Sequence, residues 1–262
     1  MLNPKTRTPL SLLITAASLA CGAGLHAALL KVDLGNSGSS PAGFSLWDPT
    51  GPNNNVGLPL VTADFAGLHL ALNASNIADI GTAPAVDGNG DLMGWSNGII
   101  TRSRAAIGST GNGSMYQDFV TAAAGGTVGL QISGLSANTA YALTFYSFDE
   151  NGSRTSIFRD YTGGANNALG NITYSNPSGA GSGNPTSDTQ YALNAIMTTD
   201  ALGRLTIGET QQGGIAPVLN GFEIATTIEA VPEPKPAGIA LIVLGLAMVG
   251  SRFRRQGIAA KA

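Results

Sequence analysis

The chain is short of the two residue types on which most metal centres and nucleophilic active sites depend. Its one cysteine is Cys21, and its two histidines are His26 and His69. Only His69 lies beyond the first 27 residues, so no zinc site with two histidines can form there within one chain. A Ser-His-Asp triad would have to use His69. Alternation along Gly67–Leu72 places His69 opposite three leucines, which predicts an exposed histidine on a strand.

Basic residues are also few, and they collect at the two ends. Between residues 28 and 230 there are six Lys and Arg against fifteen Asp and Glu, a net charge of −9. A domain of that sign repels phosphate backbones, so nucleic acid is not expected as a partner. Glycine is abundant, with 36 residues, and long charged helix formers are scarce. This composition favours short strands joined by turns.

The first 27 residues have the pattern of a secretory signal peptide. Lys5 and Arg7 form a basic start, an apolar stretch runs from Leu10 to about Gly24, and Ala27 offers a small residue for cleavage. Signal peptidase is therefore an expected partner, with export across the inner membrane. Cys21 falls inside this segment, so the exported chain would have no cysteine and could not use disulfides.

The C-terminus carries three features in a fixed order. Val231-Pro232-Glu233-Pro234 is stiff and extended because each proline fixes its own φ. An apolar run from Ala237 to Gly250 follows, and a basic cluster ends it. The cluster consists of Arg252, Arg254 and Arg255.

This tail resembles the PEP-CTERM sorting signal of Gram-negative bacteria. The resemblance covers residues 230–256 and leaves 257–262 as a short cytoplasmic tail. It implies that exosortase is a partner, that the apolar run is a single transmembrane helix, and that the basic cluster stays cytoplasmic. It further implies a transient anchor in the inner membrane, then a cell-surface or extracellular location. The association of this signal with exopolysaccharide producers implies a role in the envelope or extracellular matrix.

Residues 28–229, between the two signals, are predicted to form one all-β domain. Alternation of period two between turn residues is clearest at Thr139–Phe148, where Tyr141, Leu143 and Phe145 share a face. Short strands separated by Gly-, Pro- and Asn-rich loops indicate a β-sandwich of jelly-roll or Greek-key type. The predicted strands are Leu29–Leu34, Phe44–Trp47, Leu68–Leu72, Gln117–Val120, Val128–Ile132, Thr139–Phe148, Ile172–Tyr174, Tyr191–Met197, Leu205–Ile207 and Val218–Ile224.

Two phrases in this region carry a second resemblance. Gly134–Tyr146 (GLSANTAYALTFY) and Val218–Ile224 (VLNGFEI) are similar to segments of galactose-binding-like and malectin-like jelly-roll domains. Many such domains hold sugars in loops at one end of the sandwich. The two phrases are mostly turn and core residues, so they imply the fold, and no ligand is carried over.

The loop Asp87-Gly88-Asn89-Gly90-Asp91 is the best candidate for a metal. Oxygen side chains at Asp87, Asn89 and Asp91 alternate in a Gly-rich turn and could converge on a hard cation such as calcium, as a structural ion. A full EF-hand is absent, because Leu92 and Gly98 stand where glycine and glutamate would be needed. An ordinary polar turn explains the same residues.

A second group of charged residues follows the strongest predicted strand. Asp149, Glu150, Arg154 and Asp160 are placed in and around a loop. Their carboxylates could form an acid–base pair for glycoside chemistry, or could bind sugar hydroxyls while Tyr146, Tyr161 or Trp95 stacks on a ring. A solvated loop with local salt bridges is the alternative.

These observations predict an exported, non-enzymatic envelope or extracellular-matrix protein sorted by exosortase. The first alternative is a carbohydrate-binding module that acts on exopolysaccharide, and the second is a carbohydrate hydrolase or lyase.

Overall fold

The computed structural model describes one compact unit, within His26–Thr227. The described residues are 28–35, 40–49, 60–75, 83–94, 98–103, 115–150, 152–175, 185–187 and 190–227. The predicted signal peptide and the whole sorting signal lie outside them. Within the described parts of the chain, no helix has the length and apolar character that crossing a membrane requires.

Strands account for almost all of the regular structure, so the chain is all-β as predicted. One short 3-10 turn, η1 (Thr162–Gly164), follows the ninth strand. The strands are β1 (Ala28–Leu34), β2 (Ser45–Trp47), β3 (Leu60–Phe65), β4 (Leu68–Ala74), β5 (Ile100–Ser103), β6 (Asp118–Thr121), β7 (Thr127–Ser133), β8 (Ala140–Tyr146), β9 (Arg154–Asp160), β10 (Asn167–Tyr174), β11 (Ala192–Thr198), β12 (Leu205–Gln211) and β13 (Gly221–Thr226).

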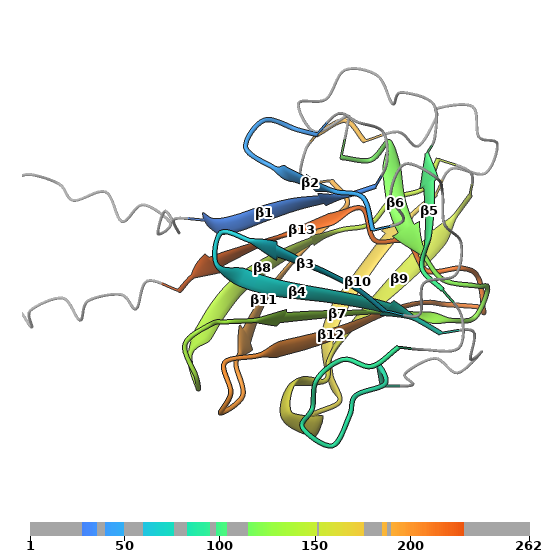
Figure 1. Cartoon of the computed structure of the whole chain (residues 1–262). Coiled ribbons are helices and arrows are strands. Elements are labelled where there is room, and N and C mark those ends of the chain that lie inside the picture. Colours follow the sequence, from blue (N-terminus) through green and yellow to red (C-terminus); the bar gives the residue numbers. More distant parts are fainter. Residues whose placement is uncertain are drawn as a thin grey trace, which may run out of the picture. The chain divides into compact units, whose positions relative to one another are not determined.

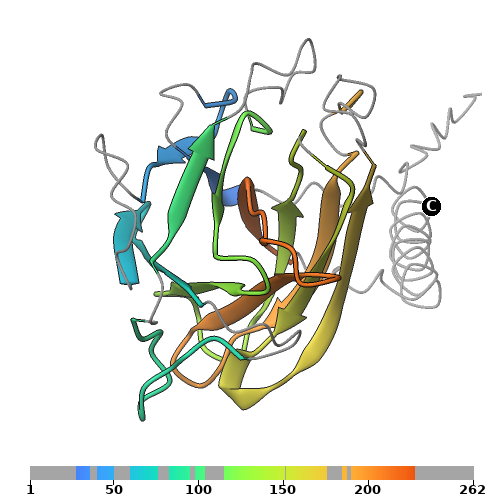
Figure 2. The same cartoon turned by 90° about the vertical axis from the view of Figure 1, so that its right-hand side faces the viewer.

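Two sheets face each other, which makes the domain a β-sandwich (Figures 1 and 2). The five-stranded sheet has the order β11-β8-β13-β1-β2, and the six-stranded sheet has the order β10-β9-β12-β7-β4-β3. A small sheet pairs β5 with β6. The described strands pair antiparallel, except that β1 and β2 are parallel. From β7 onward the chain changes sheet at almost every connection, as it does in jelly-roll sandwiches.

The core lies between the sheets because one face of each strand is apolar. Tyr141, Leu143 and Phe145 of β8 are buried, as the alternation predicts. The Phe145 ring stacks on Phe158 of β9, in the other sheet, with 5.1 Å between the ring centroids. Offset aromatic pairs of this kind add to the stabilisation from burial. The aromatic contact between β8 and β9 therefore packs the two sheets against each other.

The segment from Arg154 to Asp160 corrects one prediction. It is strand β9, hydrogen-bonded to both β10 and β12, and only Ser156 and Phe158 of its side chains are buried. Arg154 and Asp160, which were predicted to lie in and around a loop, are the first and last residues of this strand. Its strand pattern is weak because charged residues stand at both ends and only one large apolar residue faces inward. Strands β3 and β5 were also not anticipated.

Candidate functional site

The outer face of the five-stranded sheet carries a row of four polar side chains, one from each of four strands. Lys31 of β1 lies opposite Glu223 of β13, Glu223 opposite Thr144 of β8, and Thr144 opposite Asn194 of β11. These positions alternate with buried core residues, so strand geometry turns all four outward. We call Lys31, Glu223, Thr144 and Asn194 the polar row.

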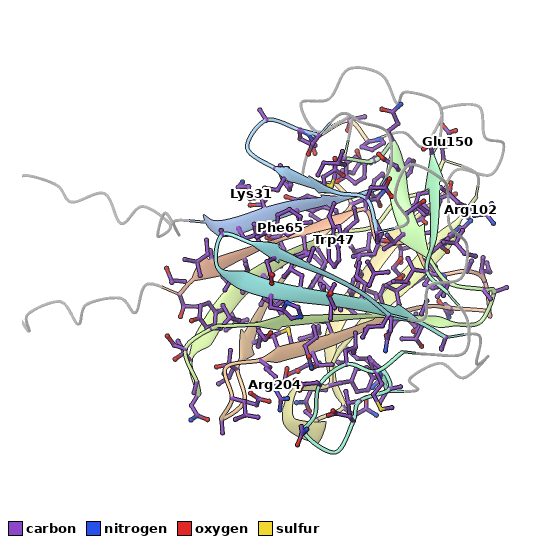
Figure 3. All side chains as sticks on the ribbon, viewed as in Figure 1. Lys31, Trp47, Phe65, Arg102, Glu150 and Arg204 are labelled. Carbon is purple, nitrogen blue, oxygen red and sulfur yellow. The ribbon has the colours of Figure 1, made fainter. Side chains whose placement is uncertain are left out.

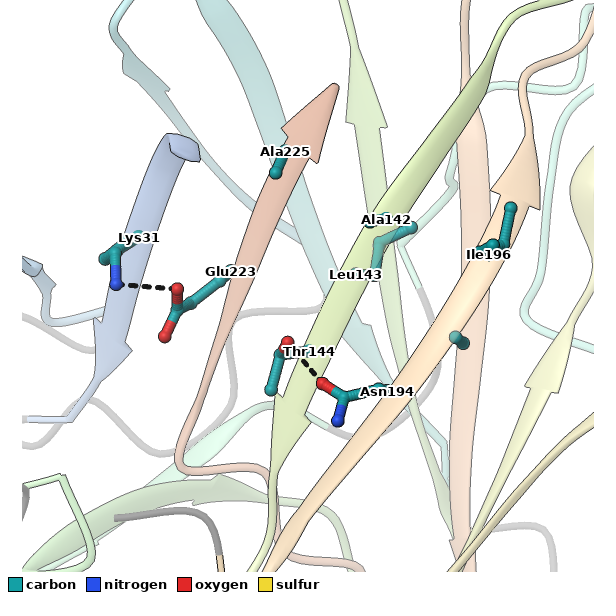
Figure 4. A pocket seen from close by; sticks show the side chains of 9 residues that line it. Lys31, Ala142, Leu143, Thr144, Asn194, Ile196, Glu223 and Ala225 are labelled. Carbon is teal, nitrogen blue, oxygen red and sulfur yellow. Dashed lines mark hydrogen bonds and ion pairs between the residues drawn. The ribbon is translucent and has the colours of Figure 1, made fainter. Parts of the chain in front are cut away.

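Neighbours within the polar row are joined in pairs (Figure 4). The Lys31 Nζ lies 2.7 Å from Glu223 Oε2, and the Thr144 hydroxyl donates to Asn194 Oδ1 at 2.8 Å. Glu223 also accepts a hydrogen bond from the Tyr146 hydroxyl at 2.5 Å. Since the ammonium and the carboxylate compensate each other, the row presents donors and acceptors with no net charge.

A strip of mostly small residues runs beside the polar row. Ala225 lies opposite Ala142, and Ala142 lies opposite Ile196, whose side chain is 70 % exposed. Because two alanines form this strip, the backbone of β8 and β13 lies close to the surface. Together the strip and the polar row line a hollow of about 680 Å³, which we call the sheet groove.

The other half of the same sheet face is closed. The Tyr146 ring meets Phe44 and Tyr116 edge-on, at 6.0 and 6.2 Å between centroids. A side chain at Gly221 would collide with Met115. Lys31 lies at this border, with its Nζ 5.2 Å from the centre of the Phe44 ring. The sheet groove thus occupies the open half of this sheet face, and the aromatic residues that cover the other half border it on one side.

The charged residues predicted after β8 do not form one site. Asp149 is fully buried and pairs with Arg154, with 2.6 Å between Oδ2 and Nη2. The Arg154 Nη1 also donates to the Ala216 carbonyl at 2.7 Å. Glu150 is half-buried next to Asp149 in the chain. Asp149 and Arg154 are therefore held together as a structural ion pair at one end of the sandwich.

Asp160 lies at the far end of β9. Six residue-to-residue steps along the strand separate it from Arg154, or roughly 20 Å at about 3.3 Å per step. Its Oδ1 accepts a hydrogen bond from the Thr162 backbone at 2.8 Å, which fixes the start of η1. Paired glycosidase carboxylates lie no more than about 9.5 Å apart. The structure thus separates the residues that the sequence grouped.

The Asp87–Asp91 loop forms a turn closed by its own side chain. The Asp87 Oδ1 accepts from the backbone of Asn89 at 2.8 Å and of Asp91 at 3.0 Å, and these bonds hold the pKa of Asp87 below its usual value. Asp91 Oδ1 accepts from Arg204 at 2.8 Å. No three Cys, His, Asp or Glu side chains gather around a common point within the described segments. Calcium at this loop remains a prediction.

Two of the three aromatic stacking partners proposed from the sequence are covered. Tyr146 and Tyr161 are 4 % and 6 % exposed, and Trp95 lies outside the described residues. His69 stands exposed on β4 with its Nδ1 2.7 Å from Asp64 Oδ1, as predicted for a surface strand histidine.

The stretch Gly94–Gly98 (GWSNG) matches the Gly-x-Ser-x-Gly spacing of a nucleophile elbow. In a nucleophile elbow this stretch leads into a helix, whereas here the next element is strand β5.

Comparison with known proteins yields structural likenesses only. No protein-family model matches the chain, and no curated protein matches it. A family 35 carbohydrate-binding module from Clostridium thermocellum is 12 % identical, over 49 % of this chain and 88 % of that chain, with a TM-score of 0.31. The CBM35 of Abf62 from Cellvibrio japonicus is 16 % identical, over 60 % and 94 %, with a TM-score of 0.26.

An exo-β-1,3-galactanase from Phanerochaete chrysosporium is also similar over part of its length. It is 15 % identical across 48 % of this chain and 26 % of that chain, with a TM-score of 0.28. Likenesses of this size add nothing to the argument about a ligand, which rests on the sheet groove itself.

Proposed function

We propose that this protein is an exported, non-catalytic module that binds polysaccharide along the sheet groove. One observation carries the proposal: the polar row stands beside a strip of mostly small side chains that the described residues leave uncovered, and the two together line a hollow of about 680 Å³. A sugar ring offers hydroxyls that both donate and accept, and the row offers both kinds of partner. The alanine strip lets a flat ring approach the sheet backbone.

The charges in and around the sheet groove indicate whether the glycan that binds there is charged or neutral. Lys31 and Glu223 neutralise each other at 2.7 Å, and the domain as a whole is acidic. A polyanionic chain would meet repulsion from the domain and no unpaired cation in the polar row. We therefore propose a neutral polysaccharide as the ligand.

A binding role fits the placement of the acidic residues better than catalysis. Asp149 is buried against Arg154, and Asp160 fixes a turn at the other end of β9. Glu223, the carboxylate in the groove, already engages Lys31 and Tyr146. General acid–base catalysis of glycoside cleavage needs two carboxyl groups facing one bond.

The binding proposal is tested first by affinity electrophoresis of residues 28–227 through gels that contain neutral polysaccharides, the producing cell's own exopolysaccharide among them. Asn194→Ala removes one exposed amide from the polar row without touching the core. Because a hydrogen bond contributes about 0.5–1.5 kcal/mol, we expect about three- to tenfold weaker binding. Asn171→Ala, an exposed asparagine on β10, is the matched control and should bind like the wild type. Equal retardation of both variants would reject the groove.

Delivery is the second part of the proposal. We propose that signal peptidase removes residues 1–27, that the tail anchors the chain in the inner membrane of a Gram-negative cell, and that exosortase then sends it to the surface or the matrix. The sequence of the tail supports this, from Val231-Pro232-Glu233-Pro234 to Arg255. The module would then place its groove among extracellular polysaccharides.

Processing is checked by intact-mass spectrometry of the protein recovered from cells that carry exosortase. We expect a mature form that lacks the segment from about Lys235 onward, because the sorting motif precedes the anchor. Cells without exosortase should retain a chain that ends at Ala262. A full-length C-terminus in both strains would refute the sorting proposal and leave the groove proposal standing.

A further inference from the structure

A second, smaller cavity lies on the outer face of the other sheet. It has a volume of about 160 Å³, between the 83–94 segment, the η1 turn and the β11–β12 hairpin. Thr206 of β12 lines it, and this side chain alternates with the core residues Leu205 and Ile207. Figure 3 shows Arg204 beside η1 and far from Glu150, so the cavity lies away from the Asp149 end of the sandwich. We call it the Arg204 pocket.

Arg204 is held in one orientation by two carboxylates. Its side chain is 10 % exposed. The Nε donates to Asp200 Oδ2 at 2.9 Å, the Nη2 lies 2.8 Å from the same oxygen, and the Nη1 donates to Asp91 Oδ1 at 2.8 Å. These contacts use three of the five N–H groups of a guanidinium. Arg204 lines the pocket, and these contacts with the described residues leave two N–H groups of its guanidinium for a ligand.

Tyr161 lines the pocket, and its hydroxyl oxygen is fully buried. Tyr161 is 6 % exposed, and among the described residues its hydroxyl makes no hydrogen bond. Leaving a buried polar group unpaired costs free energy. Gly163 and Gly164 also line the pocket, with positive φ values of 61° and 83°, and they contribute no side chain to it. A Cβ at Gly164 would meet nothing within 4 Å, so the space beside it is open.

The charges around the pocket select the kind of ligand. Arg204 contributes one positive charge, and Asp200 and Asp91 contribute two negative ones. Burial works against ionisation of Asp200, but the hydrogen bonds from Arg204 and from the turn backbone hold the pKa of Asp200 below its usual value. An anion is therefore disfavoured. A neutral polyol is favoured, because its hydroxyls can donate to the carboxylates and accept from the guanidinium.

The volume of the Arg204 pocket limits the size of the neutral polyol that it can hold. Pockets for drug-sized molecules begin at about 300 Å³, and this one holds about half of that. We propose that the Arg204 pocket binds one neutral sugar ring, at the end of a chain or as a free hexose. This site is separate from the sheet groove, and the inference does not depend on binding there.

The test uses residues 28–227, which contain every described strand and the core. Amide and arginine Nε–H signals are followed by NMR while D-galactose, D-glucose, D-mannose or their methyl glycosides are added. We expect saturable shifts at Gly163, Gly164 and the Arg204 Nε–H with at least one hexose. A methyl glycoside resembles the last sugar of a chain, because its anomeric oxygen carries a substituent. If methyl glycosides cause the same shifts as the free hexose, the pocket is assigned to chain ends. If they cause no shifts, it is assigned to free hexoses. D-Galacturonate should bind more weakly than D-galactose.

Ala165→Leu fills the pocket from its rim. Ala165 lines the cavity in an extended conformation (φ −63°, ψ 168°) that leucine adopts without strain. We expect this variant to lose at least tenfold in affinity while the amide signals of the core strands stay in place. Asn167→Leu adds the same side chain at an exposed position that does not line the cavity, and should bind like the wild type.

Three results would overturn the proposal: no saturable shift with any hexose, unchanged binding by Ala165→Leu, or tighter binding of galacturonate than of galactose. Asn194→Ala should leave the shifts at Gly163 and Gly164 intact. A failure of the sheet groove and a failure of the Arg204 pocket are therefore distinguishable in the same set of titrations.

Discussion

Raising the pH from about 5 to about 9 is expected to weaken the fold by several kcal/mol, through the buried carboxyl groups of Glu209 and Asp33. Glu209 points into the core from β12 and is 1 % exposed. Its Oε1 accepts from the Val218 backbone and from Gln211 Nε2, both at 3.3 Å, while its Oε2 has no partner among the described residues. Burial raises the pKa of Glu209 to about 8 from an ordinary value of 4.5.

The sign follows from proton binding. Because the folded pKa is the higher one, the folded state holds a proton that the unfolded state has released between about pH 4.5 and 8. The stabilisation is therefore complete below about pH 4.5 and is lost as the pH rises through about 8. At 1.36 kcal/mol per unit, the shift corresponds to up to about 5 kcal/mol. Asp33 acts in the same direction, since burial first and the nearby Asp118 second raise its pKa to about 8.

Glu209→Gln should remove the Glu209 part of this dependence and leave the Asp33 part, because the amide keeps the shape of the protonated acid and cannot ionise. Urea unfolding at about pH 4 and about pH 8.5 measures it: the variant should match the wild type at the lower pH and exceed it by several kcal/mol at the higher. Asp64→Asn is the matched control, since the Asp64 side chain is 80 % exposed. A wild-type stability that rises with pH would contradict the assignment.

The fold could be predicted where each strand carries its own signal. β8 alternates large apolar and small or polar residues between clear turns, and it was found with its inward face correct. β9 is not predicted because its alternation is weak. Three of its seven residues are charged (Arg154, Arg159 and Asp160), and only Ser156 and Phe158 are buried. β3 was missed because it lies at a sheet edge, where Thr62 and Asp64 are exposed and its apolar residues are only partly covered.

The candidate sites depend on information that alternation does not contain. The polar row joins Lys31, Thr144, Asn194 and Glu223, which meet only through the register of four strands. The pairing of Arg204 with Asp91 spans 113 residues. By contrast, Asp149 and Arg154 are five residues apart, and grouping them from the sequence was sound. In the sequence, the signal for the groove is that Thr144 on β8, Asn194 on β11 and Glu223 on β13 are polar positions on the outward faces of their strands. These residues can be recognised as one surface only when the order of the strands in the sheet is known.

Arg154→Met should cost about 3–5 kcal/mol in the free energy of unfolding. Removing one partner of a buried ion pair leaves the other charge buried without compensation. Asp149 is fully buried, and its Oδ2 receives the Arg154 Nη2 at 2.6 Å. The substitution also removes the hydrogen bond to the Ala216 carbonyl. The loss is measured by urea unfolding, with Arg102→Met as the control, because Arg102 is an exposed arginine on β5.

A double variant decides what the pair does. If Asp149 and Arg154 act as a structural pair, Asp149→Asn combined with Arg154→Met should recover part of the lost stability, because the buried negative charge that faced Arg154 is gone. Polysaccharide binding at the sheet groove should be unchanged in every variant that still folds. If Arg154→Met instead kept full stability and lost glycan binding, these two residues would belong to a ligand site after all, as one interpretation of the sequence had it.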